Sequence, residues 1–197
     1  MMIMSAITDF DTRLLFLINH ARSGFLDVVM PVLSDFRMLL PVLIPFLAYR
    51  LWKGDSRERL LWIVAIAAVA FSDVLCARVI KVLVGRSRPY EVHDGLYVYR
   101  HCKWVVTDPA FRAGIRETLA WPSCHATNMW TAASFLIAWW GRRAVPVALL
   151  AVLVCWSRIY LGVHYPLDVA GGAVIGIVLG ISWWKAGSFL ILKNSTE

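Results

Sequence analysis

The chain has 197 residues, of which 59% are hydrophobic and 17% are charged, so it is more apolar than a soluble domain of this length. The apolar residues lie in long runs, which predicts a single membrane-embedded domain over residues 1–197. The net charge of +7 comes from basic residues spread over the ends of these runs. This distribution favours membrane orientation and contact with anionic lipid headgroups, and it argues against nucleic-acid binding.

Residues 1–35 precede the long apolar runs. The first ten residues lack the basic start and the apolar core of a removable signal peptide. Residues 12–33 mix apolar and charged side chains, and Gly24 divides them. We therefore expect two short helices that lie in the membrane interface, with a single spanning element as the alternative.

Five later segments are apolar enough to be predicted transmembrane helices: residues 36–52, 60–84, 125–140, 144–160 and 167–184. The predicted fold class is all-α, an integral-membrane helical bundle of five to six transmembrane helices. Between the second and the third segment, residues 86–121 are expected to form one long extracytoplasmic loop.

Basic residues predict which side of the membrane each turn faces. Residues 50–59 hold four basic side chains, and the next turn on the same side holds Arg142 and Arg143. Cytoplasmic turns carry an excess of lysine and arginine, so we place both turns in the cytoplasm. An aromatic belt is expected at the same edge, from Trp52, Trp139, Trp140, Trp183 and Trp184. We therefore expect a multi-pass protein of the cytoplasmic (inner) membrane whose long loop faces the extracytoplasmic side.

The four cysteines show no spacing typical of a zinc or redox site. Cys76 and Cys155 fall in apolar spans, where we expect small core side chains. Cys102 and Cys124 are both expected on the outer side, where a disulfide between them stays open.

Two other features of the spans have structural explanations. Asp73 lies inside the second span, where an unpaired charge is costly, and we expect Arg78 or Asn128 to brace it. Glycines recur at helical spacing in the last span, which favours close helix packing over ligand binding: Gly172, Gly176 and Gly180.

His164 is the candidate nucleophile. A neutral imidazole attacks phosphorus directly when one tautomer is held in place. Asp168 lies four residues later, and Pro166 between them is a favoured first helical residue. The first turn of that helix brings the carboxylate to the second ring nitrogen, so we predict Asp168 as the partner of His164.

His125 is the candidate general acid at the start of the third span. Ser123 before it suits an N-cap, and the free amides behind a cap bind anions. His125 is then placed to protonate the departing oxygen. The alternative is a capped helix with an interfacial histidine.

Lys81, Arg88 and Arg158 are the candidate phosphate ligands. Phosphoryl transfer places negative charge on the non-bridging oxygens, which fixed cations stabilise. Seven residues separate Lys81 from Arg88, about two helical turns, so both can face one site. Taken singly, each of the three would be an ordinary basic anchor. Asp168 is the only acid in these segments, so we expect neither a metal nor another cofactor.

Three motifs resemble those of the type 2 phosphatidic acid phosphatase superfamily, which read K-x6-R-P, P-S-G-H and S-R-x5-H-x3-D. Here they are Lys81-x6-Arg88-Pro89, Pro122-Ser123-Cys124-His125 and Ser157-Arg158-x5-His164-x3-Asp168. Cys124 replaces the glycine of the second motif. The resemblance implies an all-α membrane core with His164, His125 and Asp168 as catalytic residues. It also implies that the phosphate is bound by Lys81, Arg88, Ser123, Arg158 and the Cys124 amide.

The function implied is metal-independent hydrolysis of a lipid phosphate or diphosphate at the extracytoplasmic face, through a phosphohistidine. Undecaprenyl diphosphate is the expected substrate, and lipid A or phosphatidylglycerophosphate is the alternative. A water-soluble phosphate ester as substrate, or a phospholipid-binding or transport protein with a disabled site, are further alternatives. The expected partners are the lipid substrate and membrane lipids, and the oligomeric state stays open.

Overall fold

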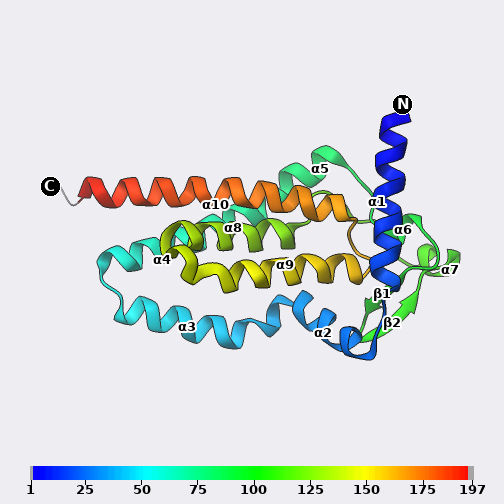
Figure 1. The fold of residues 1–197 in the computed structure, drawn as a ribbon, viewed down its shortest axis with the longest axis horizontal. Helices are drawn as coiled ribbons and strands as arrows, with labels where there is room; N and C mark the ends of the chain where they lie inside the picture. The colour runs from blue at the N-terminus through cyan, green and yellow to red at the C-terminus, as the bar shows by residue number, and fades with distance from the viewer. Residues whose placement is uncertain (1, 195–197) are drawn as a thin grey trace.

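A bundle of long helices forms the body of the molecule, for which the computed structural model describes residues 2–194 (Figure 1). The bundle helices are α3 (Leu40–Lys53), α4 (Ser56–Val74), α8 (Cys124–Trp140), α9 (Val145–Tyr160) and α10 (Pro166–Asn194). Helix α8 is central, because it packs against α4, α9 and α10.

Three stretches of the described residues are long and apolar enough to cross a membrane: Ser56–Val84, Cys124–Tyr160 and Pro166–Leu190. The middle stretch contains α8 and α9, which a 3-10 turn at Gly141–Ala144 folds back against each other (Figure 1). The predicted helical membrane bundle is therefore confirmed at this level. Helix α3 has only 14 residues and follows a 3-10 helix at Phe36–Met38, so the predicted first span is shorter than expected.

The second span changes its geometry before it ends. Helix α4 continues into a π-helix at Leu75–Ile80 and then into α5 (Lys81–Val84). Gly85 ends the span in the left-handed conformation, with φ of +66°, which favours glycine. Lys81 therefore lies in the last turn of the span, in agreement with the predicted bounds of residues 60–84.

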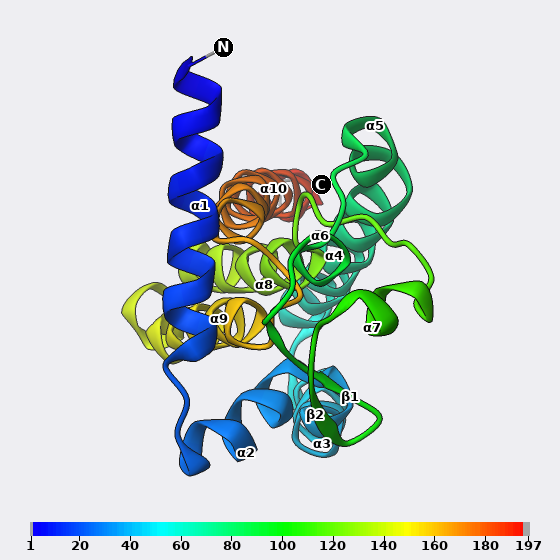
Figure 2. The ribbon, with the colours of Figure 1, turned by 90° about the vertical axis from the view of Figure 1, so that its right-hand side faces the viewer.

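The N-terminal region forms two helices that meet near Gly24, but the first is longer than predicted. Helix α1 begins at Met2 and runs for 19 residues to His20, whereas α2 (Gly24–Ser34) starts behind the N-cap Ser23. Helix α1 crosses the end of the bundle (Figure 2). It contacts both α9 and α10 there.

The long loop contains regular structure that departs from the all-α prediction. It holds α6 (Pro89–Val92), the strands β1 (Tyr97–Arg100) and β2 (Lys103–Val106), and α7 (Pro109–Ala113). The strands pair antiparallel across a turn whose two residues have positive φ, as two-residue hairpins require. Aromatic and β-branched residues make up most of both strands, which explains the local preference for a hairpin.

Asn19 fastens this hairpin to the bundle. Its side chain is fully buried. Its Oδ1 accepts a hydrogen bond of 2.9 Å from the Tyr97 amide, and its Nδ2 donates to the carbonyls of Tyr97 and Tyr160 at 2.8 and 2.7 Å. One side chain on α1 thus holds β1 against the end of α9.

Close packing of α8 on α10 explains the glycine stripe of the last span. A Cβ atom added to Gly176 would collide with the Thr127 carbonyl on α8, and one on Gly180 would collide with the Ser134 side chain. The predicted role of these glycines in helix packing is confirmed.

Asn128 braces Asp73 inside the second span, and Ser72 in turn holds Asn128. Asn128 on α8 donates a hydrogen bond of 2.7 Å to Asp73 Oδ1, and the Ser72 hydroxyl donates to Asn128 Oδ1 at 2.7 Å. Of the two braces expected, Asn128 is the one that the structure shows.

Cys76 and Cys124 form a disulfide, with Cα atoms 5.7 Å apart. Cys76 is buried, as predicted for a core side chain, but its disulfide with Cys124 was not predicted. The π-helix carries Cys76 to the start of α8, whereas Cys102 lies exposed in the hairpin turn and forms no disulfide. Cys155 is buried and free, as predicted.

Candidate active site

A tight turn between α9 and α10 delivers His164 to the interior of the protein. Gly162 in this turn has a φ of +67°, and a Cβ atom there would lie 2.9 Å from the Tyr97 carbonyl oxygen. Glycine meets both constraints, because it tolerates positive φ and close backbone approach. The His164 side chain is only 2% exposed.

Asp168 lies beside His164, as the spacing predicts. Helix α10 begins at Pro166, so its first turn carries Asp168, which is fully buried. Its Oδ2 is 3.5 Å from Nδ1 of His164 and also accepts a hydrogen bond of 2.9 Å from the Tyr165 amide. The distance to His164 is within ion-pair range, but Nδ1 makes no hydrogen bond. Catalytic hydrogen bonds are often this long without substrate.

Positive charge surrounds His164. Burial lowers the pKa of this imidazole well below its ordinary value of 6.5, and the charges of Arg158, Arg88 and Lys81 lower it further. His125 acts on it in the same direction. The three cations and both histidines of the sequence prediction therefore gather in one place. The ring is neutral at neutral pH, so its Nε2 lone pair is available.

The cations retain hydrogen-bonding capacity. The buried Nε atoms of Arg88 and Arg158 have no partner among the described residues. Arg158 also donates from Nη1 to the Ser34 hydroxyl at the end of α2. Lys81 donates to the carbonyls of Leu119 and Ala120 at 2.7 and 3.2 Å. Buried donors without partners cost about 1–3 kcal/mol each, and phosphate oxygens are acceptors that suit them.

The second motif forms the turn before α8. Ser123 is the N-cap residue, as predicted, but its hydroxyl makes no capping bond and is buried without a partner in the described structure. Its amide donates to the Asp168 carbonyl at 2.9 Å, which joins the second motif to the third. The disulfide from Cys124 joins it to the span that carries Lys81.

Sequence reasoning missed three residues of this region. Ser34 contacts Arg158, while Arg86 and Asp11 lie behind Asp168. Arg86 stands between the two basic residues of the first motif, which was the available signal. Ser34 and Asp11 come from the N-terminal helices, and no local pattern connects them with the motifs.

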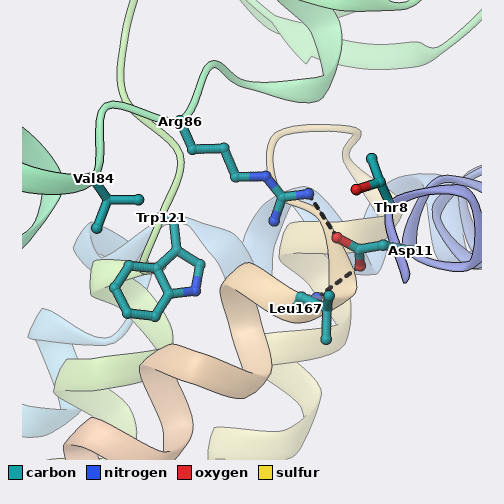
Figure 3. A pocket seen from close by; sticks show the side chains of 6 residues that line it. All are labelled: Thr8, Asp11, Val84, Arg86, Trp121 and Leu167. Atoms are coloured by element: carbon teal, nitrogen blue, oxygen red, sulfur yellow. Dashed lines mark hydrogen bonds and ion pairs between the residues drawn. The ribbon is translucent and has the colours of Figure 1, made fainter. Parts of the chain in front are cut away.

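A cavity of about 360 Å³ lies beside Arg86, between α1, α5 and α10 (Figure 3). Its lining comprises Thr8, Asp11, Val84, Arg86, Trp121 and Leu167. None of the eight predicted site residues lines it.

The sequence is similar to those of known membrane phosphatases. A family model described as the PAP2 superfamily matches residues 44–191. A lipid A 4′-phosphatase of Bacteroides thetaiotaomicron is 31% identical over 185 residues, which cover 90% of this chain and 76% of that protein. A putative undecaprenyl-diphosphatase of Escherichia coli is 32% identical over 142 residues, covering 71% of this chain and 64%, less than two thirds, of that protein.

Two crystal structures share the fold. LpxE of Aquifex aeolicus matches with a TM-score of 0.64 and 26% identity, over 88% of this chain and 93% of that one. A PAP2-type phosphatidylglycerolphosphate phosphatase of Bacillus subtilis matches with a TM-score of 0.62 and 21% identity, over 90% and 84%.

The family expected from the three motifs is confirmed. So is the enzyme class, a phosphatase of lipid phosphates, because the relatives are named as such phosphatases. Because the family model matches residues 44–191 and a relative is 31% identical over most of both proteins, this chain belongs to the PAP2 superfamily.

Proposed function

We propose that the chain hydrolyses a lipid phosphate or diphosphate through a phosphohistidine on His164. The observation that carries the proposal is the setting of His164: a buried, neutral imidazole beside Asp168 and among three cations. The unpartnered Nε atoms of Arg88 and Arg158 and the free hydroxyl of Ser123 add donors for phosphate oxygens.

In the first step, Nε2 of His164 attacks phosphorus, since Nδ1 faces Asp168. The N–P bond forms as the bond from phosphorus to the leaving oxygen breaks. His125 gives its proton to that oxygen, and the lipid alcohol or lipid phosphate departs. Asp168 stabilises the positive charge that develops on the imidazole of His164.

In the second step, a water molecule attacks the phosphohistidine. His125, now neutral, takes a proton from the water as the new P–O bond forms and the N–P bond breaks. Inorganic phosphate leaves, and His164 returns to its neutral form. The reaction consumes one water, and no redox change occurs.

The substrate itself prepares His125 for its role. Arg158, Arg88 and Lys81 act electrostatically on His125 in the free protein. A bound phosphate carries about two negative charges at neutral pH and offsets these cations. His125 then holds its proton more readily in the complex than in the free enzyme. Substrate binding therefore favours the protonated form that acts as general acid.

Metal-independent catalysis is part of the proposal. The three cations supply the charge that a divalent ion provides in other phosphatases. Within the described residues, no group of three or more His, Cys, Asp or Glu side chains is arranged to hold a metal ion.

We place the site on the extracytoplasmic side, with five membrane crossings: α3, α4 with α5, α8, α9 and α10. The disulfide of Cys76 and Cys124 lies at the end of the helix bundle that holds His164, which we call the site's end. Disulfides persist in oxidising compartments. Arg142 and Arg143 lie at the opposite end, as expected for a cytoplasmic turn. Helix α3 is about 21 Å long, so local thinning of the bilayer accommodates it.

Undecaprenyl diphosphate is the substrate that we propose. Lipid A is the second candidate, because a lipid A 4′-phosphatase aligns over 90% of this chain. Both place a phosphate at the headgroup of a long apolar tail, which suits a site at the membrane edge.

A phosphate-release screen on the purified protein in EDTA tests the proposal. The panel is undecaprenyl diphosphate, lipid A, phosphatidylglycerophosphate, phosphatidic acid and a water-soluble phosphate ester. We expect release from a lipid and acid-labile, base-stable phosphate on the protein after a rapid quench. Release from the soluble ester alone would replace the lipid with a soluble substrate. Lipid binding without any release would support a binding or transport protein.

A further inference from the structure

Arg86 lies between two buried carboxylates. Its Nη1 donates to Asp168 Oδ1 and its Nη2 donates to Asp11 Oδ2, both at 2.7 Å. The side chains of both aspartates are fully buried, and that of Arg86 is 26% exposed. The two ends of one guanidinium therefore connect the catalytic carboxylate with an acid on α1.

Asp11 also holds the beginning of α10. Its Oδ1 accepts a hydrogen bond of 2.9 Å from the Leu167 amide, one of the first amides of that helix (Figure 3). These amides have no partner within their own helix, and a carboxylate is favoured beside them. Asp11 thus fixes both Arg86 and the helix turn that carries Asp168.

The contacts of Asp168 divide between its two oxygens. Oδ1 is bound by Arg86, whereas Oδ2 accepts from the Tyr165 amide and faces Nδ1 of His164. A buried carboxylate is costly unless it is paired and hydrogen-bonded. Arg86 supplies the paired charge at Oδ1, so Oδ2 stays directed at His164.

Resting on the proposed function, we propose that Arg86, held by Asp11, is a positioning residue that keeps Asp168 ionised and aimed at His164. In this arrangement each terminal nitrogen of Arg86 donates to a carboxylate, so the guanidinium is directed at Asp168 and Asp11. Its guanidinium also lies over the Tyr165 ring, 4.0 Å from the ring centre, which fixes its plane. Its effect therefore belongs to the chemical step and not to substrate binding.

The cavity beside Arg86 makes this role testable by chemical rescue. It is lined by Arg86 itself and measures about 360 Å³, far more than a guanidinium ion needs. Truncation of Arg86 enlarges it further, so a small cation can enter and pair with Asp168 and Asp11.

The experiment compares wild type with Arg86→Ala on undecaprenyl diphosphate and on lipid A. We expect kcat to fall about 10- to 100-fold, with KM nearly unchanged. Losses of this size are typical when a residue that orients a functional side chain by hydrogen bonds is removed. Millimolar guanidinium should restore part of kcat, whereas urea, a neutral molecule of similar shape, should not. Arg88→Ala is the matched control, because it removes a phosphate ligand and should raise KM without rescue through this cavity.

Two milder variants carry the test if Arg86→Ala fails to fold. Arg86→Lys keeps the charge but replaces the two-armed bridge with a single point, and we expect an intermediate loss of kcat. Asp11→Asn keeps an acceptor for the Leu167 amide and should lower kcat less than Arg86→Lys does. A rise in KM with constant kcat in these variants, or unchanged kinetics, would overturn the positioning role. Inactivity of wild type on every lipid would instead refute the proposed function.

Discussion

The two ends of the helix bundle are held together by different interactions. At the site's end, Lys81, His164 and Asp168 are all buried and charged or titratable. At the opposite end, the ring of Trp62 lies edge-on to those of Trp139 and Trp140, with centroids 5.3 and 5.2 Å away. One end depends on polar networks, the other on aromatic packing.

The contrast shows where this protein tolerates unfavourable interactions. The aromatic end buries large apolar rings, which favours folding at little polar cost. The site's end keeps buried donors on Arg88 and Arg158 without partners in the described structure. Such groups lower stability but are available to a phosphate. Catalysis and stability should therefore respond to mutations at opposite ends of the bundle.

The largest effect is expected from His164→Ala. Removing the nucleophile should lower kcat by more than about 10³-fold, because no phosphohistidine can form. The melting temperature in detergent should change much less than activity does, since the ring makes no hydrogen bond through Nδ1. Phosphate release and thermal unfolding measured on one preparation check this. Full turnover in the variant would refute the nucleophile assignment.

Trp62→Ala should show the opposite pattern. Trp62 is only 4% exposed, and the cavity left by an aromatic residue costs about 3–5 kcal/mol. Below the lowered melting temperature, kcat should remain close to that of wild type. Trp52→Ala is the control, because Trp52 is 71% exposed and its loss should matter far less. Equal destabilisation by both variants would argue against a packed aromatic end.

Removing the disulfide at the site's end should have a smaller effect on stability. Cys76→Ser or Cys124→Ser opens a link across 48 residues, and such losses typically cost about 2–4 kcal/mol. Cys102→Ser, at an exposed free thiol, is the control and should leave unfolding unchanged. Thermal unfolding with and without reductant measures the difference. A reductant that lowers the melting temperature of wild type but not of Cys76→Ser would identify this bond.

The sequence predicts those site contacts that depend on local spacing. His164 and Asp168 are four residues apart across a helix start, and Lys81 lies one turn before the glycine that ends its span. The contact of Arg86 with Asp11 was missed, because no local period and no motif connects these two residues. The π-helix at Leu75–Ile80 was not predicted either, because most of the side chains around it are apolar and no change in composition marks the extra residue per turn.

The smallest effect expected is a pH dependence of stability that comes from His164. Burial, followed by the charges of Arg158, Arg88 and Lys81 and that of His125, lowers the pKa of its imidazole in the folded protein. Unfolding returns this pKa to about 6.5, so below that pH the unfolded chain binds more protons than the folded one. The free energy of unfolding must then decrease as the pH falls from about 6.5.

The comparison of wild type with His164→Gln isolates this contribution. A single proton gives a slope of at most about 1.4 kcal/mol per pH unit, and Gln cannot take up that proton. Unfolding free energies measured between about pH 4.5 and 7 should therefore fall more steeply in wild type than in the variant. Titrating groups far from His164 contribute to both proteins and largely cancel in the difference. Parallel curves would mean that His164 keeps an ordinary pKa. The residues around it would then not be what favours its neutral form.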